Sequence, residues 1–176
     1  MNVFIRELYY TDEIKGFIVM FKRWEEKKEL PGIDSLTFAN GAVILLDWRE
    51  SFDNHTKEKK AWCTPLCDTS FSSIEKYDSD CWVPVDSWSF VEHKGGKIYG
   101  GDGAMGNEGS LVYIDADNNF VWGFFFTQTN PISFISVSND ILMAINEHSE
   151  LKLIINLSNL TEIEVEVVMF PNCVSV

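Results

Sequence analysis

Short stretches in which apolar and polar residues alternate dominate the C-terminal third of the chain. Residues 162–167 read Glu-Ile-Glu-Val-Glu-Val, the period-two pattern of a strand with one face on a core and the other in water. Residues 151–157 alternate in the same way, and Ser158 and Asn159 supply turn residues between the two runs. The pattern predicts a β-hairpin at residues 151–167.

Further strands are predicted upstream of this hairpin. Residues 120–126 are apolar at nearly every position, which is typical of a strand covered on both faces, and Asp117–Asn119 separate them from the apolar residues 111–114. Two more runs, residues 132–137 and 141–145, flank the turn residues Ser138, Asn139 and Asp140. Together these runs predict an antiparallel meander.

The N-terminal part carries weaker signals. Residues 3–10 and 17–24 resemble strands, although residues 20–30 are also compatible with a short helix. Asn40-Gly41 followed by the apolar residues 42–48 predicts a turn and then a strand.

One helical turn is expected from Thr69 or Ser70 to Tyr77. Within it, Ser72 and Glu75 are spaced like a capping box. No other segment has comparable helix-start signals, so we expect little helix.

We therefore predict a mainly β fold, either an antiparallel meander sheet or a β-sandwich, formed by residues 1–176 as a single domain. Apolar residues make up 45% and aromatic residues 14% of the chain, far more than in a disordered acidic polymer. Residues 49–90 mix Trp and Pro with many Asp and Ser, and we expect a long irregular connection there. Residues 95–109 contain seven glycines and predict a wide loop.

Negative charge is concentrated in residues 61–176. The chain carries a net charge of -13, and residues 61–176 hold sixteen acidic and four basic residues, against eleven and ten in residues 1–60. A surface with this excess attracts basic partners and repels phosphates. We therefore expect a basic protein partner and no direct binding of nucleic acid.

The chain also offers no membrane or metal signal. Residues 1–10 lack a secretory signal, and the longest apolar runs, such as residues 17–21, are far too short to span a bilayer. We expect a cytoplasmic protein whose cysteines are reduced. Cys63, Cys67 and Cys81 are spaced more loosely than zinc-binding pairs, which leaves zinc open, but buried structural thiols are the favoured interpretation and no cofactor is expected.

Three sequence features that could indicate a functional site are not supported by the residues around them. Gly101–Gly106 matches G-x-G-x-x-G, but a strand-like segment follows it where a nucleotide site needs a helix. Asp115–Asn119 begins like a calcium loop but lacks its glycine and its final glutamate. His55, His93 and His148 lie in different predicted loops without a local catalytic signature.

The best candidate for a functional surface is a set of carboxylates and large aromatic residues in segments predicted to be irregular. Tyr and Trp supply buried contact area at interfaces, and carboxylates complement Lys and Arg. The alternative is that the tryptophans cap the sheet and the acids solvate the loops. The predicted interface residues are Asp68, Glu75, Tyr77, Asp78, Asp80, Trp82, Asp86, Trp88, Asp102 and Glu108.

In overall character, and in the Gly-rich and aromatic stretch of residues 95–126, the chain resembles the small acidic immunity proteins of bacterial polymorphic-toxin and contact-dependent inhibition systems. That resemblance implies a cytoplasmic antitoxin that binds a cognate toxin domain, commonly a basic nuclease. It transfers no functional residue, because these families share no invariant motif. Two alternatives remain open: an enzyme using His55, His93 or His148 with carboxylates, and an acidic mimic of nucleic acid. The oligomeric state also stays open, because an uncovered edge strand can pair with another chain.

Overall fold

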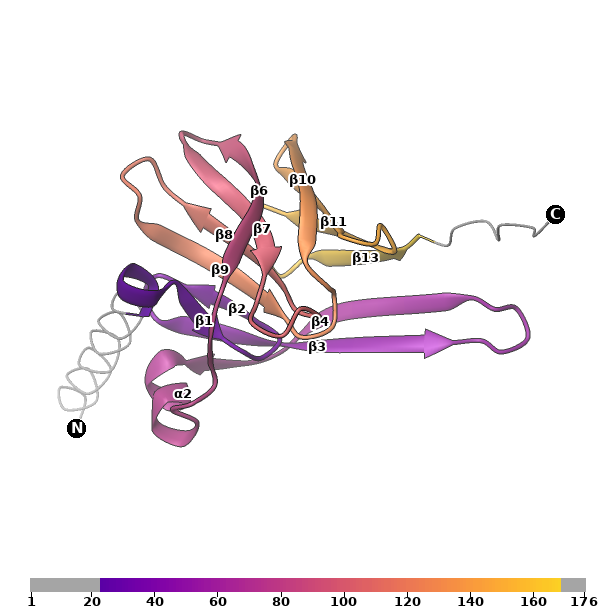
Figure 1. Ribbon diagram of the computed structural model, residues 1–176, viewed down its shortest axis with the longest axis horizontal. Coiled ribbons are helices and arrows are strands. Elements are labelled where there is room, and N and C mark those ends of the chain that lie inside the picture. Colours follow the sequence, from indigo (N-terminus) through magenta and orange to yellow (C-terminus); the bar gives the residue numbers. More distant parts are fainter. Residues whose placement is uncertain (1–22, 169–176) are drawn as a thin grey trace, which may run out of the picture.

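The computed structural model describes residues 23–168, which form three layers (Figure 1). A seven-stranded antiparallel sheet with the order β4-β3-β2-β9-β8-β7-β6 is the middle layer. A four-stranded sheet with the order β10-β11-β12-β13 packs on one face of it, and a short helix, α2, and the two-stranded β1–β5 ribbon cover part of the other face. The predicted mainly β, antiparallel fold is confirmed.

The elements follow each other as β1 (Glu29–Pro31), β2 (Ser35–Phe38), β3 (Ala42–Phe52), β4 (Lys59–Ser70), α2 (Phe71–Tyr77), β5 (Trp82–Pro84), β6 (Asp86–His93), β7 (Gly96–Asp102), β8 (Gly109–Ile114), β9 (Phe120–Phe126), β10 (Ile132–Ser138), β11 (Ile141–Asn146), β12 (Leu151–Asn156) and β13 (Ile163–Val167). Residues 23–27 are also helical.

The predicted meander is divided between two sheets: β8 and β9 lie in the seven-stranded sheet, and β10–β13 form the four-stranded sheet. β12 and β13 pair in the expected hairpin, with Leu153 opposite Val165, and β10 and β11 pair around the predicted turn. The alternation holds because Leu151, Leu153 and Ile155 face the seven-stranded sheet while the intervening residues lie nearer to water. The local pattern of apolar and polar residues is sufficient to predict these four strands, because each strand pairs with its neighbour in sequence.

β9 is covered on both faces, as its apolar sequence predicts. Phe124 packs into the core between the two sheets, whereas Phe125 packs into the core beneath α2 and the β1–β5 ribbon. Both side chains are fully buried. β9 therefore lies in the centre of the middle layer, and the predicted turn at Asp117–Asn119 joins it to β8.

The turn between β2 and β3 contains the predicted Asn40-Gly41. Gly41 has a φ of 85°, a left-handed conformation that glycine adopts at no steric cost, and its N–H donates to the Phe38 carbonyl at 2.9 Å. The Asn40 side chain accepts a hydrogen bond from the Ala42 N–H at 3.0 Å. Both interactions reverse the chain into β3.

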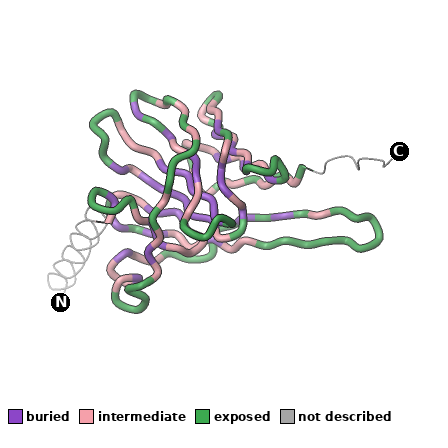
Figure 2. The backbone as a smooth tube through the Cα atoms, in the orientation of Figure 1, coloured by how far each residue is buried: buried purple, intermediate pink, exposed green. Residues whose placement is uncertain are grey.

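The prediction of a long irregular connection at residues 49–90 is wrong. β3 continues to Phe52 and pairs residue by residue with β4 from Lys59, so the two strands form a hairpin that extends well beyond the rest of the sheet (Figure 1). Much of this hairpin is exposed (Figure 2), and its sequence therefore lacks the alternation of a half-buried strand. α2, β5 and β6 account for most of the remaining residues.

The wide glycine loop predicted at residues 95–109 is also wrong. Residues 96–102 form β7, and the connection to β8 is only residues 103–108. Several of these glycines lie where a neighbouring strand or the other sheet approaches the backbone too closely for a side chain. A Cβ on Gly100 would come within 3.0 Å of side chains of β10, and one on Gly101 would collide with the Asp86 backbone of β6.

α2 begins where it was predicted, but the cap differs. Ser70 is the N-cap, and its side chain accepts a hydrogen bond from the Ser73 N–H at 3.2 Å. The proposed pairing of Ser72 with Glu75 is wrong, because Glu75 contacts Arg23 and Trp82 instead.

The strand predicted at residues 17–24 is wrong where it can be compared, because residues 23 and 24 are helical. The rest of that segment, the strand predicted at residues 3–10, and Cys173 lie outside the described residues. No helix within residues 23–168 is long and apolar enough to cross a membrane.

Candidate protein interface

Trp82, predicted at the interface, lies in the core. Its indole is stacked on Phe71 with ring centroids 5.0 Å apart, and only 9% of the residue is exposed. The indole N–H donates to the Glu75 carboxylate at 2.8 Å, and the Arg23 guanidinium lies 4.7 Å from the ring centroid. Trp82 fixes α2 and the β1–β5 ribbon to the large sheet.

Glu75 is occupied in the same cluster. Arg23 forms ion pairs with Glu29 at 2.8 Å and with Glu75 at 3.2 Å. Burial lowers the pKa of Arg23, but hydrogen bonds and the charges of the two carboxylates outweigh that effect and hold the pKa above its ordinary value. Glu75 thus neutralises a partly buried guanidinium, which is a structural task.

Glu108 is also internal. The residue is 8% exposed, and its carboxylate accepts a hydrogen bond from the Met105 N–H at 3.0 Å. This contact closes the six-residue connection between β7 and β8. Sequence alone does not distinguish it from the exposed acids, because the turn that buries it is defined only by the pairing of the two strands.

The other predicted interface residues lie at the surface in separate places. Tyr77 ends α2 and is 76% exposed, and Asp78 and Asp80 follow it and are also exposed. The Lys76 ammonium lies 4.7 Å from the centroid of the Tyr77 ring and donates to its hydroxyl at 3.0 Å. Asp68 is exposed on β4.

Asp86 and Asp102 come together. They are Cα partners at the end of the β6–β7 ladder, so two acidic residues stand directly opposite each other. One of the carboxylate oxygens of Asp102, Oδ1, is buried and has no hydrogen-bond partner within the described chain. Like charges directly opposite each other destabilise a ladder, and a buried acceptor without a donor adds to the cost.

The same two strands also carry exposed aromatic residues. Trp88 interrupts the β6–β7 register at a bulge and is 47% exposed, and Phe90 is 57% exposed. The Phe90 and Tyr99 rings have centroids 6.1 Å apart. We call Asp86, Trp88, Phe90, Tyr99 and Asp102 the acidic edge.

Sequence reasoning missed Phe90 and Tyr99. The signal that could have found Phe90 is the run Phe90-Val91, an aromatic and a β-branched residue that favour a strand. That signal was overlooked because the segment was expected to be irregular. A hollow of about 350 Å³ adjoins the acidic edge and is lined by Trp24, Lys28, Val85, Asp86, Ser87, Tyr99, Ile114 and Asn118.

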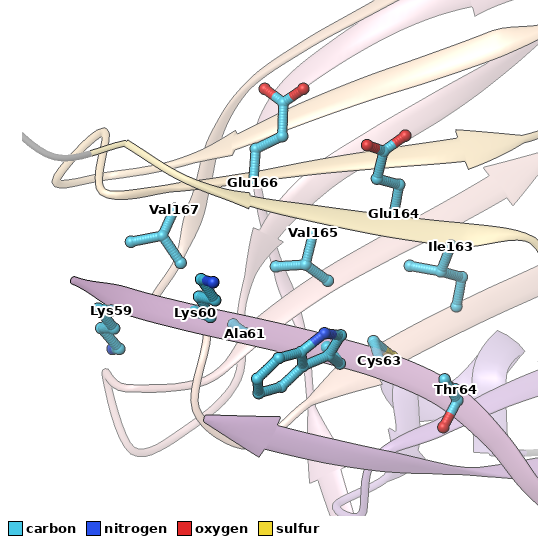
Figure 3. Close-up of a pocket in the computed structure, with 11 residues that line it drawn as sticks. Lys59, Lys60, Ala61, Cys63, Thr64, Ile163, Glu164, Val165, Glu166 and Val167 are labelled. Atoms are coloured by element: carbon cyan, nitrogen blue, oxygen red, sulfur yellow. The ribbon is translucent and has the colours of Figure 1, made fainter. Parts of the chain in front are cut away.

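A larger groove of about 650 Å³ lies elsewhere, between the edges of the two sheets (Figure 3). One wall is β4, the last strand of the seven-stranded sheet, and the other is β13, the last strand of the four-stranded sheet. Residues 59–64 and 163–167 line it. We call it the seam groove.

The three histidines lie apart. His55 is in the turn between β3 and β4, and His148 is exposed in the turn between β11 and β12. His93 ends β6, with its Nε2 3.9 Å from an Asp140 oxygen that the Lys94 ammonium contacts at 3.0 Å. Burial, and then the charge of Lys94, lower the pKa of His93.

Within the described residues, Cys63, Cys67 and Cys81 are free thiols. Burial raises the pKa of the Cys63 thiol to about 12, and burial also raises the pKa of Cys81. Within residues 23–168, no three His, Cys, Asp or Glu side chains are grouped closely enough to hold a metal ion.

Comparison with known proteins adds no family to this description: no protein-family model matches the chain, and no curated protein is significantly similar to it. Function must therefore be argued from the surfaces themselves.

Proposed function

We propose that this protein acts by binding a basic protein at the acidic edge and so blocking that partner. In its more specific form, the proposal is an immunity protein, an antitoxin that neutralises a cognate toxin domain such as a nuclease. The observation that carries it is the placement of Asp86 directly opposite Asp102, on a pair of strands that also carries the exposed rings of Trp88 and Phe90.

The paired carboxylates favour a cationic partner group. An Arg or Lys side chain placed between Asp86 and Asp102 would replace their mutual repulsion with two attractive contacts. A guanidinium suits this arrangement best, because its planar set of donors reaches two carboxylates at once.

The aromatic side chains favour a protein as the partner. Exposed Trp, Tyr and Phe beside charged groups provide the apolar contact area that anchors protein interfaces. Trp88 and Phe90 are both about half exposed. They would lose that exposed area against a partner surface, while the carboxylates fix its orientation.

Long-range attraction would complete the mechanism. The net charge of -13 creates a field that speeds encounter with a basic domain and weakens as salt is added. A nuclease binds phosphates through a basic surface, so an inhibitor that covers this surface blocks access to nucleic acid. The inhibition needs no chemical step, only a stable complex.

The experiment is affinity capture of the tagged protein's partner from its native lysate at low and moderate salt, followed by reconstitution from purified components. The expected result is one basic protein bound near one to one and released by salt. Reversing the exposed acid of the pair, as Asp86→Lys, should weaken binding by at least about tenfold.

The matched control is Asp117→Lys, which changes the net charge by the same amount. Asp117 is exposed in the turn between β8 and β9. If both substitutions weaken binding equally, total charge governs the interaction and the chain mimics nucleic acid instead. If His93→Ala abolishes a turnover that the folded protein performs, the enzyme alternative replaces the proposal.

A further inference from the structure

We propose that the outer face of the four-stranded sheet is a docking site for a basic amphipathic helix of a partner protein. This face is the side of β10–β13 that is turned away from the seven-stranded sheet. It is a different surface from the acidic edge, and the proposal does not rest on the inhibitor function. Three features carry it: apolar side chains that belong to neither core, carboxylates without a cation, and the length of the strands.

β11 is apolar on both of its faces. Leu142 and Ala144 are buried in the core between the two sheets. Ile141, Met143 and Ile145 alternate with them, so they point away from that core. β9 has the same apolar pattern, and a core covers each of its faces. Because a sequence of this kind is typical of a strand covered on both sides, the outer side of β11 is suited to a cover from outside the described chain.

The neighbouring strands extend this apolar surface. Phe134 of β10 lies opposite Ile145, and Ile154 of β12 lies opposite Met143. Phe134 is 50% exposed and Ile141 is 39% exposed. We call Phe134, Ile141, Met143, Ile145 and Ile154 the outer apolar face. None of the five packs against either described core, and a group of apolar side chains on an open sheet face indicates an interaction site.

The surroundings of the outer apolar face are acidic. Residues 132–168 contain six acidic residues and a single Lys or Arg, Lys152. The Lys152 ammonium already pairs with Glu166 at 2.8 Å. Glu164 lies opposite Ile154, points away from the seam groove (Figure 3) and forms no ion pair in the described part of the chain. Its carboxylate is therefore available to a cation of a partner.

These charges favour a cationic partner over a second copy of this chain. Two copies would bring the same carboxylates together, and each copy carries a net charge of -13. An amphipathic helix has an apolar stripe bordered by polar positions, so its Leu or Ile residues would cover the outer apolar face while Lys or Arg beside them reach Glu164. β11 and β12 each have six residues and are about 20 Å long, the length of a helix of about 14 residues.

The binding test uses a fluorescent helical peptide of about 14 residues, with leucine along one face, lysine on both sides of that stripe and alanine elsewhere. Polarisation should show saturable binding to the full chain that weakens as salt is added. A scrambled peptide of the same composition, whose leucines are spread around the helix, should bind at least about tenfold more weakly. Absence of binding, or equal binding of the two peptides, would overturn the proposal, since equal binding needs charge alone.

Two substitutions test whether the peptide occupies this face. Phe134→Ser should weaken binding by at least about tenfold, whereas Phe52→Ser, which removes a similarly exposed ring on β3, should not. Glu164→Lys should weaken binding by about fivefold. Glu58→Lys makes the same charge change in the turn between β3 and β4 and should have a much smaller effect. Equal effects of each variant and its control would place the peptide elsewhere and contradict the proposal.

A photoreactive group on the peptide identifies the strands that it contacts. Cross-links should fall within residues 132–168. Cross-links to β6 or β7 would show that the peptide binds the acidic edge, which would overturn this proposal and leave the inhibitor function standing. Sedimentation of the free protein tests the second-copy alternative: if the native chain dimerises and Phe134→Ser makes it monomeric, the face is a contact between copies and the proposal is wrong.

Discussion

Asp86 and Asp102 face each other across the β6–β7 ladder, two carboxylates in a position where opposite charges or apolar pairs would stabilise the sheet. A pairing that costs stability in the free protein is useful when a bound cation relieves it. At the acidic edge, the pairing that lowers the stability of the free protein is therefore the one that favours the proposed binding of a cationic partner.

The cost of this pair can be measured in the free protein. Asp86→Asn removes one charge from an exposed position and should raise the free energy of unfolding by roughly 0.2–1 kcal/mol at low salt. The gain should shrink as salt screens the repulsion. Urea unfolding at two salt concentrations checks this, with Asp117→Asn, in the turn between β8 and β9, as a control that changes little. Equal effects of the two substitutions would show that the repulsion is not local.

Trp82 and Trp88 should respond very differently to truncation. Trp82→Ala removes a buried ring stacked on Phe71 and should lower the free energy of unfolding by about 3–5 kcal/mol. Trp88→Ala removes a half-exposed ring and should cost less than about 1 kcal/mol. Chemical denaturation of both variants makes the comparison. Comparable losses would contradict the placement of Trp88 at the surface.

The N-cap of α2 gives a third test. Ser70→Ala removes the acceptor for the Ser73 N–H and should cost about 0.5–2 kcal/mol. Ser72→Ala removes only a side-chain contact with Ser70 and should cost less. If Ser72→Ala were the more damaging change, the cap predicted from sequence would be correct and the described one wrong.

His93 should make stability depend on pH. Because burial lowers its pKa in the folded protein, the unfolded chain binds the proton more tightly. The stability that the neutral His93 side chain contributes is fully present above the ordinary histidine pKa of about 6.5. It is lost as the pH falls through the lower pKa of His93 in the folded protein. The difference in unfolding free energy between the native protein and His93→Gln should therefore fall from pH 7.5 toward about pH 5. A difference independent of pH would contradict the assignment.

The cysteines should differ in reactivity. Cys67 is exposed, whereas burial holds the Cys63 thiol protonated with a pKa of about 12. Brief alkylation of the folded protein, read by peptide mass spectrometry, should modify Cys67 and leave Cys63 intact until the protein is unfolded. Early modification of Cys63 would show that the strand carrying it opens readily.

Only the features that are set by residues close together in the chain could be predicted from the sequence. The hairpins of β8–β9 and β12–β13 follow from alternation and turn residues, because their strands are neighbours in the chain. The β3–β4 hairpin was missed because residues such as Trp62 and Leu66 are exposed on it and hide the period of two. Pairing of β2 with β9 joins segments far apart in sequence, which no local pattern specifies.

The candidate site was only partly predictable for the same reason. Trp82 and Trp88 occur in similar acidic surroundings in the sequence, yet α2 and Arg23 cover one and leave the other at the surface. Burial of Glu108 likewise depends on how tightly β7 turns into β8. Residue type identifies a set of candidates, and tertiary packing decides which of them can reach a partner.

The central claim is that specific acids of this chain capture a basic protein. Its most direct measurement is the association rate constant of the purified partner with the native protein and with Asp86→Lys, across a range of salt. The account predicts fast association that slows steeply with salt, and at least about tenfold slower association for Asp86→Lys than for the Asp117→Lys control. Identical rates for the two variants would contradict it.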